Sequence, residues 1–230
     1  MPKAEPAVPI LAADQATKEY ADLVALHPLT LGVPRGESVA LVGHNGSGKS
    51  TFLAMAAGLL ELSDGEITVL GEPAGSSPAR AAVSYLPDAP VLYDDLSVRE
   101  HLAYVAALHG VPIDVADLDE LLDRLGLGDR ADDLPARFSR GLRQRTSIAL
   151  GLVRPFELLL VDEPFVGLDA SGKSSLLTIL DELHADGAAL IVATHDPSYV
   201  DHVDRCIALR DGQVIHDGPA TPDEVIELVG

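Results

Sequence analysis

The segment V-A-L-V-G-H-N-G-S-G-K-S-T, residues 39–51, constrains the fold more than any other part of this chain. It holds the spacing G-x-x-x-x-G-K-[ST] from Gly43 to Ser50, with a strand-like apolar run before it and a helix-forming run after it. In that context, glycines let successive backbone N–H groups turn toward a phosphate at the positive end of a helix. The segment therefore predicts a strand–loop–helix unit that binds nucleotide phosphates, within an α/β fold whose sheet is mostly parallel.

Other near-continuous apolar runs indicate strands that are buried on both faces of such a sheet. With the run before the glycine loop, these expected strands cover residues 37–43, 81–87, 157–163 and 188–195. Helical patterns follow several of them, at residues 49–60, 171–185 and 197–203. A late strand (Q-V-I-H-D-G) and a closing helix (T-P-D-E-V-I-E-L-V-G) complete the expected core.

The middle of the chain has a different pattern, with no strand-like run between Asp94 and Arg154. Ser97 and Glu100 have the capping-box spacing that begins a helix, and two more helical patterns follow. We therefore expect one domain over residues 1–230, with an all-helical lobe at about 88–154 inserted into a core lobe at about 8–87 and 155–230.

Two acidic residues follow the apolar run L-L-L-V, so they lie at the carboxyl end of a buried strand, where ligands bind in open α/β sheets. Asp162 is placed to hold Mg²⁺, and Glu163 to orient an attacking water as general base; the plainer interpretation is a solvated carboxylate pair. Lys49 is expected to reach the β- and γ-phosphates and Ser50 to offer its hydroxyl to Mg²⁺. His195 ends the next apolar run; a histidine there is more often structural, but at the same sheet edge as Glu163 a γ-phosphate contact is favoured.

Composition excludes several classes of function. With 16 Lys and Arg against 36 Asp and Glu, the net charge of −20 argues against binding to nucleic acid or anionic lipid. The single cysteine, Cys206, excludes an internal disulfide and fits a reducing compartment. No apolar run approaches the ~18 residues of a membrane span, and the first residues do not form a secretion signal, so we expect a cytoplasmic protein. A second S-G-K-S, at 171–174, lacks a preceding strand and is expected to begin an exposed helix.

These residues together resemble the nucleotide-binding subunit of ATP-binding cassette (ABC) transporters. The resemblance covers about Tyr20 to Gly218 and rests on six segments in the family's order. They are G-H-N-G-S-G-K-S-T (Walker A), Y-L-P-D-A-P-V-L-Y-D-D-L-S-V-R-E (Q-loop region), F-S-R-G-L-R-Q-R (signature), L-L-L-V-D-E-P (Walker B), G-L-D (D-loop) and A-T-H-D (switch histidine).

The resemblance implies a P-loop NTPase core with N-terminal antiparallel strands, ATP and Mg²⁺ as ligands, and two subunits that enclose two ATP molecules. Tyr20 matches the aromatic residue that stacks on adenine. The nucleotide-binding residues implied are Tyr20, Gly43, His44, Asn45, Gly46, Ser47, Gly48, Lys49, Ser50 and Thr51. Ser139 and Gly141 would contact the γ-phosphate held by the opposite subunit, and Asp169 would bridge the two sites.

Two motifs depart from the family's pattern. The usual L-S-G-G-Q is here Phe138 to Leu142 with Arg140 in place of the first glycine, and Asp88 replaces the Q-loop glutamine. Both forms look like exporter-type cassettes. We expect Asp88 to act weakly as a Mg²⁺ ligand and mainly to couple the helical lobe to a membrane partner docked near residues 88–96.

Four arginines crowd into nine residues of the signature segment: Arg137, Arg140, Arg143 and Arg145. Arginines near a helix N-terminus oppose the helix dipole, unless a bound triphosphate faces that terminus. We expect them to supply a positive field for the phosphates. Alternatively, several pair with local carboxylates such as Asp132 and Asp133, and both interpretations hold for different arginines.

The resemblance implies an ATPase subunit that dimerises head to tail, with itself or with a related cassette, and drives export through a separate transmembrane permease. It would lie on the inner face of the cell membrane. One alternative is a soluble ABC-type ATPase of an assembly complex, for instance in iron–sulfur assembly. Cassettes of DNA repair or translation usually carry coiled-coil insertions, a zinc module or tandem cassettes, which this sequence lacks, and a P-loop kinase would lack the signature.

Overall fold

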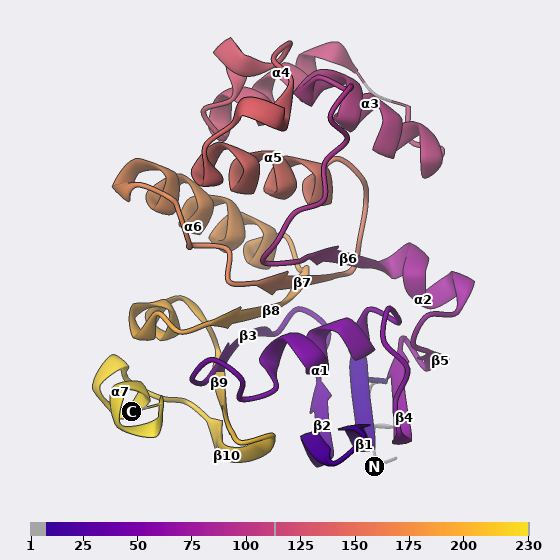
Figure 1. The fold of residues 1–230 in the computed structure, drawn as a ribbon, viewed down its shortest axis with the longest axis vertical. Helices are drawn as coiled ribbons and strands as arrows, with labels where there is room; N and C mark the ends of the chain where they lie inside the picture. The colour runs from indigo at the N-terminus through magenta and orange to yellow at the C-terminus, as the bar shows by residue number, and fades with distance from the viewer. Residues whose placement is uncertain (1–7, 113, 230) are drawn as a thin grey trace, which may run out of the picture. The chain divides into compact units, whose positions relative to one another are not determined.

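A computed structural model describes residues 8–112 and 114–229 (Figure 1). The described chain forms two compact units. Of the described residues, unit 1 contains 8–85, 156–162 and 183–229, and unit 2 contains 86–112, 114–155 and 163–182. Within the described residues, no helix has the length and apolar character needed to cross a membrane.

Unit 1 contains an antiparallel sheet built mainly from the N-terminal part of the chain, as expected. Its strand order is β2-β1-β4-β5. The strands are β1 (Leu11–Tyr20), β2 (Leu23–Val33), β4 (Asp64–Val69) and β5 (Glu72–Pro73). Register shifts interrupt the β1–β2 ladder, and the polar residues Asp14 and Gln15 face outward at the first of them. These irregularities explain why the sequence shows no clean alternation of apolar and polar residues here.

The second sheet of unit 1 is the mostly parallel one, with strand order β10-β9-β3-β8-β7-β6. Its strands are β3 (Ser38–Val42), β6 (Val83–Leu86), β7 (Leu158–Asp162), β8 (Ala189–Thr194), β9 (Arg205–Arg210) and β10 (Gln213–Gly218). Every residue of β3, β7 and β8 is buried, which accounts for their unbroken apolar sequence. Strand β9, which the sequence analysis did not identify, runs parallel to β3 and closes an antiparallel hairpin with β10.

Helix α1 (Lys49–Ala56) packs against strands of both sheets and forms part of their shared core (Figure 1). Phe52, Leu53 and Met55 are buried there. The helix is shorter than the expected 49–60 because Gly58 adopts φ +70°, a left-handed conformation typical of helix ends.

Two other elements of unit 1 differ from expectation. A short helix, α2 (Ser77–Ala82), begins where the Ser76 hydroxyl accepts the Ala79 N–H, so the expected strand 81–87 starts only at Val83. Residues Pro197–His202 form a 3-10 helix, η3, rather than an α-helix. The closing helix, α7 (Pro222–Val229), packs against η3 and β9.

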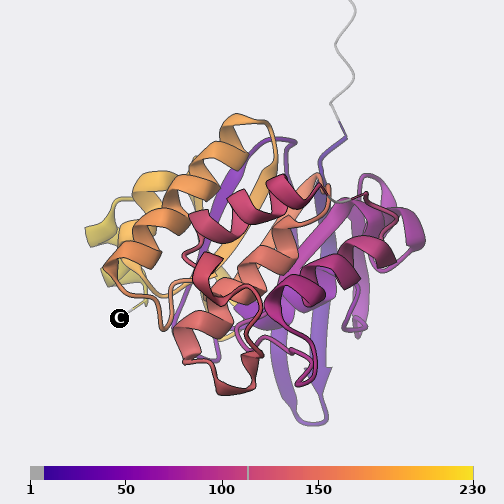
Figure 2. The ribbon, with the colours of Figure 1, turned by 90° about the horizontal axis from the view of Figure 1, so that it is seen from above.

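Unit 2 is helical. Its α-helices are α3 (Val98–Leu108), α4 (Val115–Arg124), α5 (Arg140–Leu152) and most of α6 (Ala170–Ala185). Two 3-10 turns, η1 (Gly128–Arg130) and η2 (Pro135–Arg137), precede α5. The capping box predicted at Ser97 and Glu100 is present at the start of α3, and α3 packs against α5, as the view from above also shows (Figure 2).

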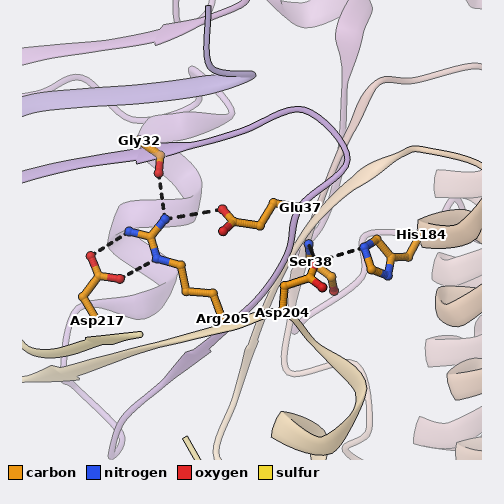
Figure 3. A network of polar contacts seen from close by, with 7 residues as sticks. All are labelled: Gly32, Glu37, Ser38, His184, Asp204, Arg205 and Asp217. Carbon is orange, nitrogen blue, oxygen red and sulfur yellow. Dashed lines mark hydrogen bonds and ion pairs between the residues drawn. The ribbon is translucent and has the colours of Figure 1, made fainter. Parts of the chain in front are cut away.

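One side chain, Arg205, joins the first and last parts of unit 1 (Figure 3). Its guanidinium binds both carboxylate oxygens of Asp217, at 2.5 and 2.7 Å, and donates to the Gly32 carbonyl at 2.9 Å. It also lies 3.4 Å from a carboxylate oxygen of Glu37, whose pKa is nevertheless raised by burial. These contacts tie β2, β9, β10 and the turn before β3 together.

Asp204, next to Arg205, makes a second set of contacts in the same network (Figure 3). Its carboxylate accepts the Ser38 N–H at 2.9 Å and lies 3.0 Å from Nε2 of His184. The Asp204 N–H donates in return to the Ser38 carbonyl at 3.0 Å. The N-terminal end of β3 is therefore held on both its donor and its acceptor side.

Candidate functional site

The register of three parallel strands brings distant motifs to one edge of the second sheet. Strand β8 lies between β3 and β7, with Val42 opposite Thr194 and Asp162 opposite Ala193. The glycine loop leaves β3 directly after Val42, and His195 follows the last residue of β8. The loop, Asp162 and His195 therefore emerge from neighbouring strand ends within unit 1.

The glycine loop is packed so closely that side chains are excluded at two of its glycines. A Cβ on Gly43 would lie 2.3 Å from the Leu209 carbonyl oxygen and 2.5 Å from the Ser47 hydroxyl. Gly48 has φ +104°, and a Cβ there would lie 2.9 Å from the Ala25 carbonyl oxygen. The loop is thus a glycine-dependent cradle, as backbone recognition of phosphate requires.

Lys49, the first residue of α1, is buried, with 5% of its surface exposed. Its Nζ donates to the carbonyl oxygens of Gly43 at 2.8 Å and His44 at 3.3 Å. The ammonium group is therefore held over the loop that precedes its own helix. A buried ammonium requires a set of acceptors, and phosphate oxygens would supply stronger ones than carbonyls.

The other loop residues vary in exposure. Nδ1 of His44 lies 2.8 Å from the Asn45 carbonyl oxygen, and its Nε2 lies 3.5 Å from the Asp211 carboxylate at the β9–β10 turn. Asn45, Gly46 and Ser50 are exposed, and Thr51 is half-buried. The Ser47 hydroxyl is buried and has no hydrogen-bond partner within the described residues. An unpartnered buried hydroxyl and the tight glycine cradle both fit a phosphate ligand.

The acidic end of β7 consists of a buried carboxylate, Asp162, followed by a residue with an uncommon backbone conformation, Glu163. Asp162 closes β7 and is buried, whereas His195 is exposed at the same edge. Glu163 has φ +49°, a left-handed conformation that is uncommon for a residue with a side chain. Gln15, Ala21, Leu70 and Asp211 have similar φ values, and Glu163 differs from them in directly following a fully buried strand at the candidate site.

Tyr20 ends β1 and leaves 46% of its surface exposed. The Lys18 ammonium lies 5.0 Å from its ring centroid, and this ammonium also donates to the Glu61 carbonyl oxygen at 2.7 Å. Stacking on adenine is the role that the resemblance implies for this partly exposed ring.

In unit 2, the signature segment starts helix α5. Ser139 is its N-cap, and its hydroxyl accepts the Leu142 N–H at 3.3 Å. Gly141 lies against the D-loop segment, because a Cβ on Gly141 would be 2.5 Å from the Gly167 carbonyl oxygen. The loop that begins G-L-D and the first turn of α5 are thus in direct contact.

Two signature arginines form ion pairs that the sequence analysis did not identify. Arg140 lies 3.2 Å from Asp88, and Arg145 lies 2.5 Å from Asp169. The alternative pairing with Asp132 and Asp133 is not what the structure shows within the described residues. Asp132 instead pairs with Arg99, and Asp133 pairs with Arg130.

Asp169 is held firmly in its loop. Its carboxylate accepts the Gly172 N–H at 2.9 Å, and this hydrogen bond, followed by the Arg145 charge, holds the pKa of Asp169 below its usual value. The second S-G-K-S segment lies inside α6, where the Lys173 ammonium is 5.6 Å from the Phe165 ring centroid. As expected, this lysine belongs to a helix and not to a glycine loop.

Comparison with known proteins agrees with this geometry. Residues 26–166 match the family model described as "ABC transporter". A solved structure, of an ATP-binding subunit of an ABC transporter, superposes with a TM-score of 0.86 at 32% identity, covering 95% of this chain and 99% of that one.

Two curated relatives carry more specific names. The SkfA peptide export ATP-binding protein SkfE of Bacillus subtilis is 34% identical over 204 residues, which cover 87% of this chain and 85% of SkfE. The macrolide export ATP-binding/permease protein MacB 1 of Aeromonas hydrophila is 36% identical over 206 residues, or 86% of this chain. The chain spans about a third of the length of that second relative, since the match covers 32% of it.

Proposed function

Because the chain belongs to the ABC transporter family, as one of its ATP-binding cassette ATPases, we propose that it powers export of a substrate through a separate transmembrane permease subunit. The observation that carries the proposal is the strand register that gathers the glycine loop, Asp162 and His195 at one sheet edge. That edge is where ligands bind in open α/β sheets.

The proposed reaction is in-line attack of water on the γ-phosphate of ATP. Glu163 orients the water and accepts its proton, and Lys49 and His195 stabilise the charge that develops on the phosphate oxygens. Tyr20 stacks on adenine, and the backbone of the loop from Gly43 to Thr51 holds the phosphates. The tight glycine cradle and the buried Lys49 support these roles.

Mg²⁺ would be held by the Ser50 hydroxyl and the Asp162 carboxylate, with Asp88 as a further candidate. Oxygen donors of this kind are what Mg²⁺ prefers. When bound, the ion would neutralise charge on the β- and γ-phosphate oxygens.

We propose that two cassettes, identical or related, close head to tail on two ATP molecules. Ser139 and the Gly141 N–H of one chain would then contact the γ-phosphate held by the other, and Asp169 would bridge the two sites. The placement of Ser139 as the N-cap of α5 supports this, because helix N-termini favour anions. Hydrolysis would remove the γ-phosphate contacts and reopen the dimer.

Export is favoured by two kinds of observation. Asp88 and the R-G-L-R-Q-R form of the signature look like exporter-type cassettes, and two relatives are named for peptide export and macrolide export. A separate permease is favoured by SkfE, which is named as an ATP-binding protein and matches over 85% of its length. The proposed dock is the segment 88–96, where Val91 and Tyr93 are exposed.

In this proposal residues 1–230 form one ATP-binding domain, with a core lobe at about 8–87 and 155–230 and a helical lobe at about 88–154. The cassette sits on the cytoplasmic face of the cell membrane, held there by its permease.

The test is recovery of partners with a variant that binds ATP without hydrolysing it. A tagged Glu163→Gln chain is expressed in its native cells, the membranes are solubilised in mild detergent with ATP present, and co-purified proteins are identified by mass spectrometry. A stoichiometric polytopic membrane protein is the expected result. A Lys49→Ala chain, deprived of the closed dimer, is the matched control for contacts that depend on ATP.

Recovery of soluble partners alone would replace the transport proposal with the assembly-complex alternative. The hydrolytic chemistry would be the same in both, so ATPase assays do not separate them.

A further inference from the structure

Two of the positions at which this chain departs from the family's usual motifs contact each other. Asp88, in place of the Q-loop glutamine, lies 3.2 Å from the guanidinium of Arg140, in place of the first signature glycine. The two residues are 52 positions apart in the chain and both belong to unit 2. One substitution therefore supplies the counter-ion of the other.

The Arg140 side chain, which pairs with Asp88, passes beside Gly167 of the D-loop segment. Its Cγ and Cδ would lie 3.1 and 3.3 Å from a Cβ built on Gly167. A Cβ at Gly167 would therefore press on the stem of the arginine. The acid at position 88, the first turn of α5 and Gly167 thus form one contact cluster.

The neighbouring pair shows that this contact differs from a fixed structural tie. Arg145 is 19% exposed and holds Asp169, which the Gly172 N–H also binds. Arg140 and Asp88 are 64% and 47% exposed, and no hydrogen bond besides their own pairing anchors either carboxylate oxygen or guanidinium within the described residues. Exposed ion pairs contribute little to stability, so breaking the Arg140–Asp88 pair costs little free energy.

The positive charge of Arg140 indicates which group could replace Asp88 as its partner. A cation in the first turn of a helix is unfavourable unless an anion lies beside it. Asp88 supplies that anion to α5, and a triphosphate at the same helix end would supply more negative charge. The carboxylate and the phosphate are therefore alternative partners for Arg140.

We infer that Asp88 is an internal counter-ion that competes with the γ-phosphate of the opposite cassette for Arg140, and so raises the ATP concentration needed to close the dimer. This inference rests on the proposed head-to-tail dimer. Arg140 is in this view a positioning residue: it stays paired with Asp88 until a nucleotide phosphate replaces the carboxylate.

The test measures dimer formation against ATP concentration by sedimentation velocity, in the Glu163→Gln background so that hydrolysis does not intervene. Asp88→Asn removes the competing charge, and we expect the ATP midpoint to fall about two- to fivefold, the range of an exposed ion pair. Asp88→Glu keeps the charge, so its midpoint should lie closer to that of the parent chain than the midpoint of Asp88→Asn does. Glu157→Gln makes the same change in net charge at an exposed pair of unit 1 and serves as the matched control.

Arg140→Gln separates competition from general repulsion. If Asp88 acts through Arg140, adding Asp88→Asn to Arg140→Gln should shift the midpoint less than twofold. An equal shift in both backgrounds, or no shift from Asp88→Asn alone, would overturn the inference and leave the dimer standing. If Glu163→Gln forms no dimer at any ATP concentration, the dimer proposal fails and this inference fails with it.

Discussion

Lys49 donates a hydrogen bond to the carbonyl oxygen of Gly43, the residue that begins its own glycine loop, across 2.8 Å. The ammonium group of this buried side chain is therefore prepositioned over its own loop. Prepositioning lowers the entropic cost of ATP binding, because the side chain has few rotamers left to lose.

Lys49→Ala should weaken ATP binding roughly 10- to 100-fold, because hydrogen bonds to charged groups contribute about 1.5–3 kcal/mol. Isothermal titration with a non-hydrolysable ATP analogue measures the change. Lys173→Ala is the control: it alters the same dipeptide, Gly-Lys, inside helix α6, and affinity should stay within about twofold. An equal loss in both variants would contradict the assignment of the loop.

Glu163→Gln should slow ATP turnover by about 10²–10⁴-fold while leaving ATP affinity unchanged, because the amide cannot accept the proton of the attacking water. Steady-state phosphate release and nucleotide binding are measured on the same preparation. Glu157→Gln, the same chemical change at the opposite end of the Walker B strand, should leave turnover within about twofold. A Glu163→Gln variant with near-normal turnover would remove Glu163 from the base role.

Arg205→Met should lower the free energy of unfolding by about 2–3 kcal/mol. The change leaves the carboxylates of Asp217 and Glu37 and the Gly32 carbonyl without their shared donor, and unpaired groups of this kind are costly. Urea denaturation followed by circular dichroism gives the value. Arg35→Met, which breaks an exposed pair with Glu157, should cost less than about 1 kcal/mol.

Stability should fall at high pH because of Cys206. Burial, and then the Asp217 charge, raise the pKa of this thiol from 9.0 to about 11. A group whose pKa is raised on folding stabilises the native state below its unfolded pKa, and that contribution is lost as pH rises from 9.0 toward 11.

At pH 10 the native protein should therefore lose about 1 kcal/mol of its free energy of unfolding relative to pH 8 through this group alone. Comparing the pH dependence of wild type with that of Cys206→Ala isolates the effect. Parallel pH profiles for the two proteins would contradict it.

Sequence alone predicts the parts of the fold that repeat a strong local pattern. Strands β3, β7 and β8 are buried on both faces, so their apolar runs are continuous and readable. Helix α2 is only six residues long and depends on the Ser76 cap, so periodicity does not reveal it. Likewise, the end of α1 is decided by the conformation of Gly58, and not by the apolar pattern that runs past it.

The candidate site shows the same division between local and distant information. The glycine loop and its lysine follow from spacing, because phosphate recognition needs consecutive backbone groups. The partners of the signature arginines do not, since Arg140 finds its acid 52 residues away while the nearer Asp132 and Asp133 are bound by Arg99 and Arg130. Proximity in sequence favours Asp132 and Asp133 as partners of the signature arginines, but other arginines, Arg99 and Arg130, bind these two carboxylates.

The position of β3 in its sheet sets an order of events during synthesis. The strand that carries the glycine loop has β8 and β9 as its two neighbours, with Ser38 opposite Leu190 and Val39 opposite Arg205. Strand β3 leaves the ribosome early, but the strands that pair with it, β8 and β9, leave late. Pairing between segments so distant in sequence is slow to form. Until residues 189–210 emerge, both edges of β3 are open to any chaperone or to a neighbouring nascent chain. Nucleotide binding would accordingly report that β8 and β9 have paired with β3, the strand that carries the loop.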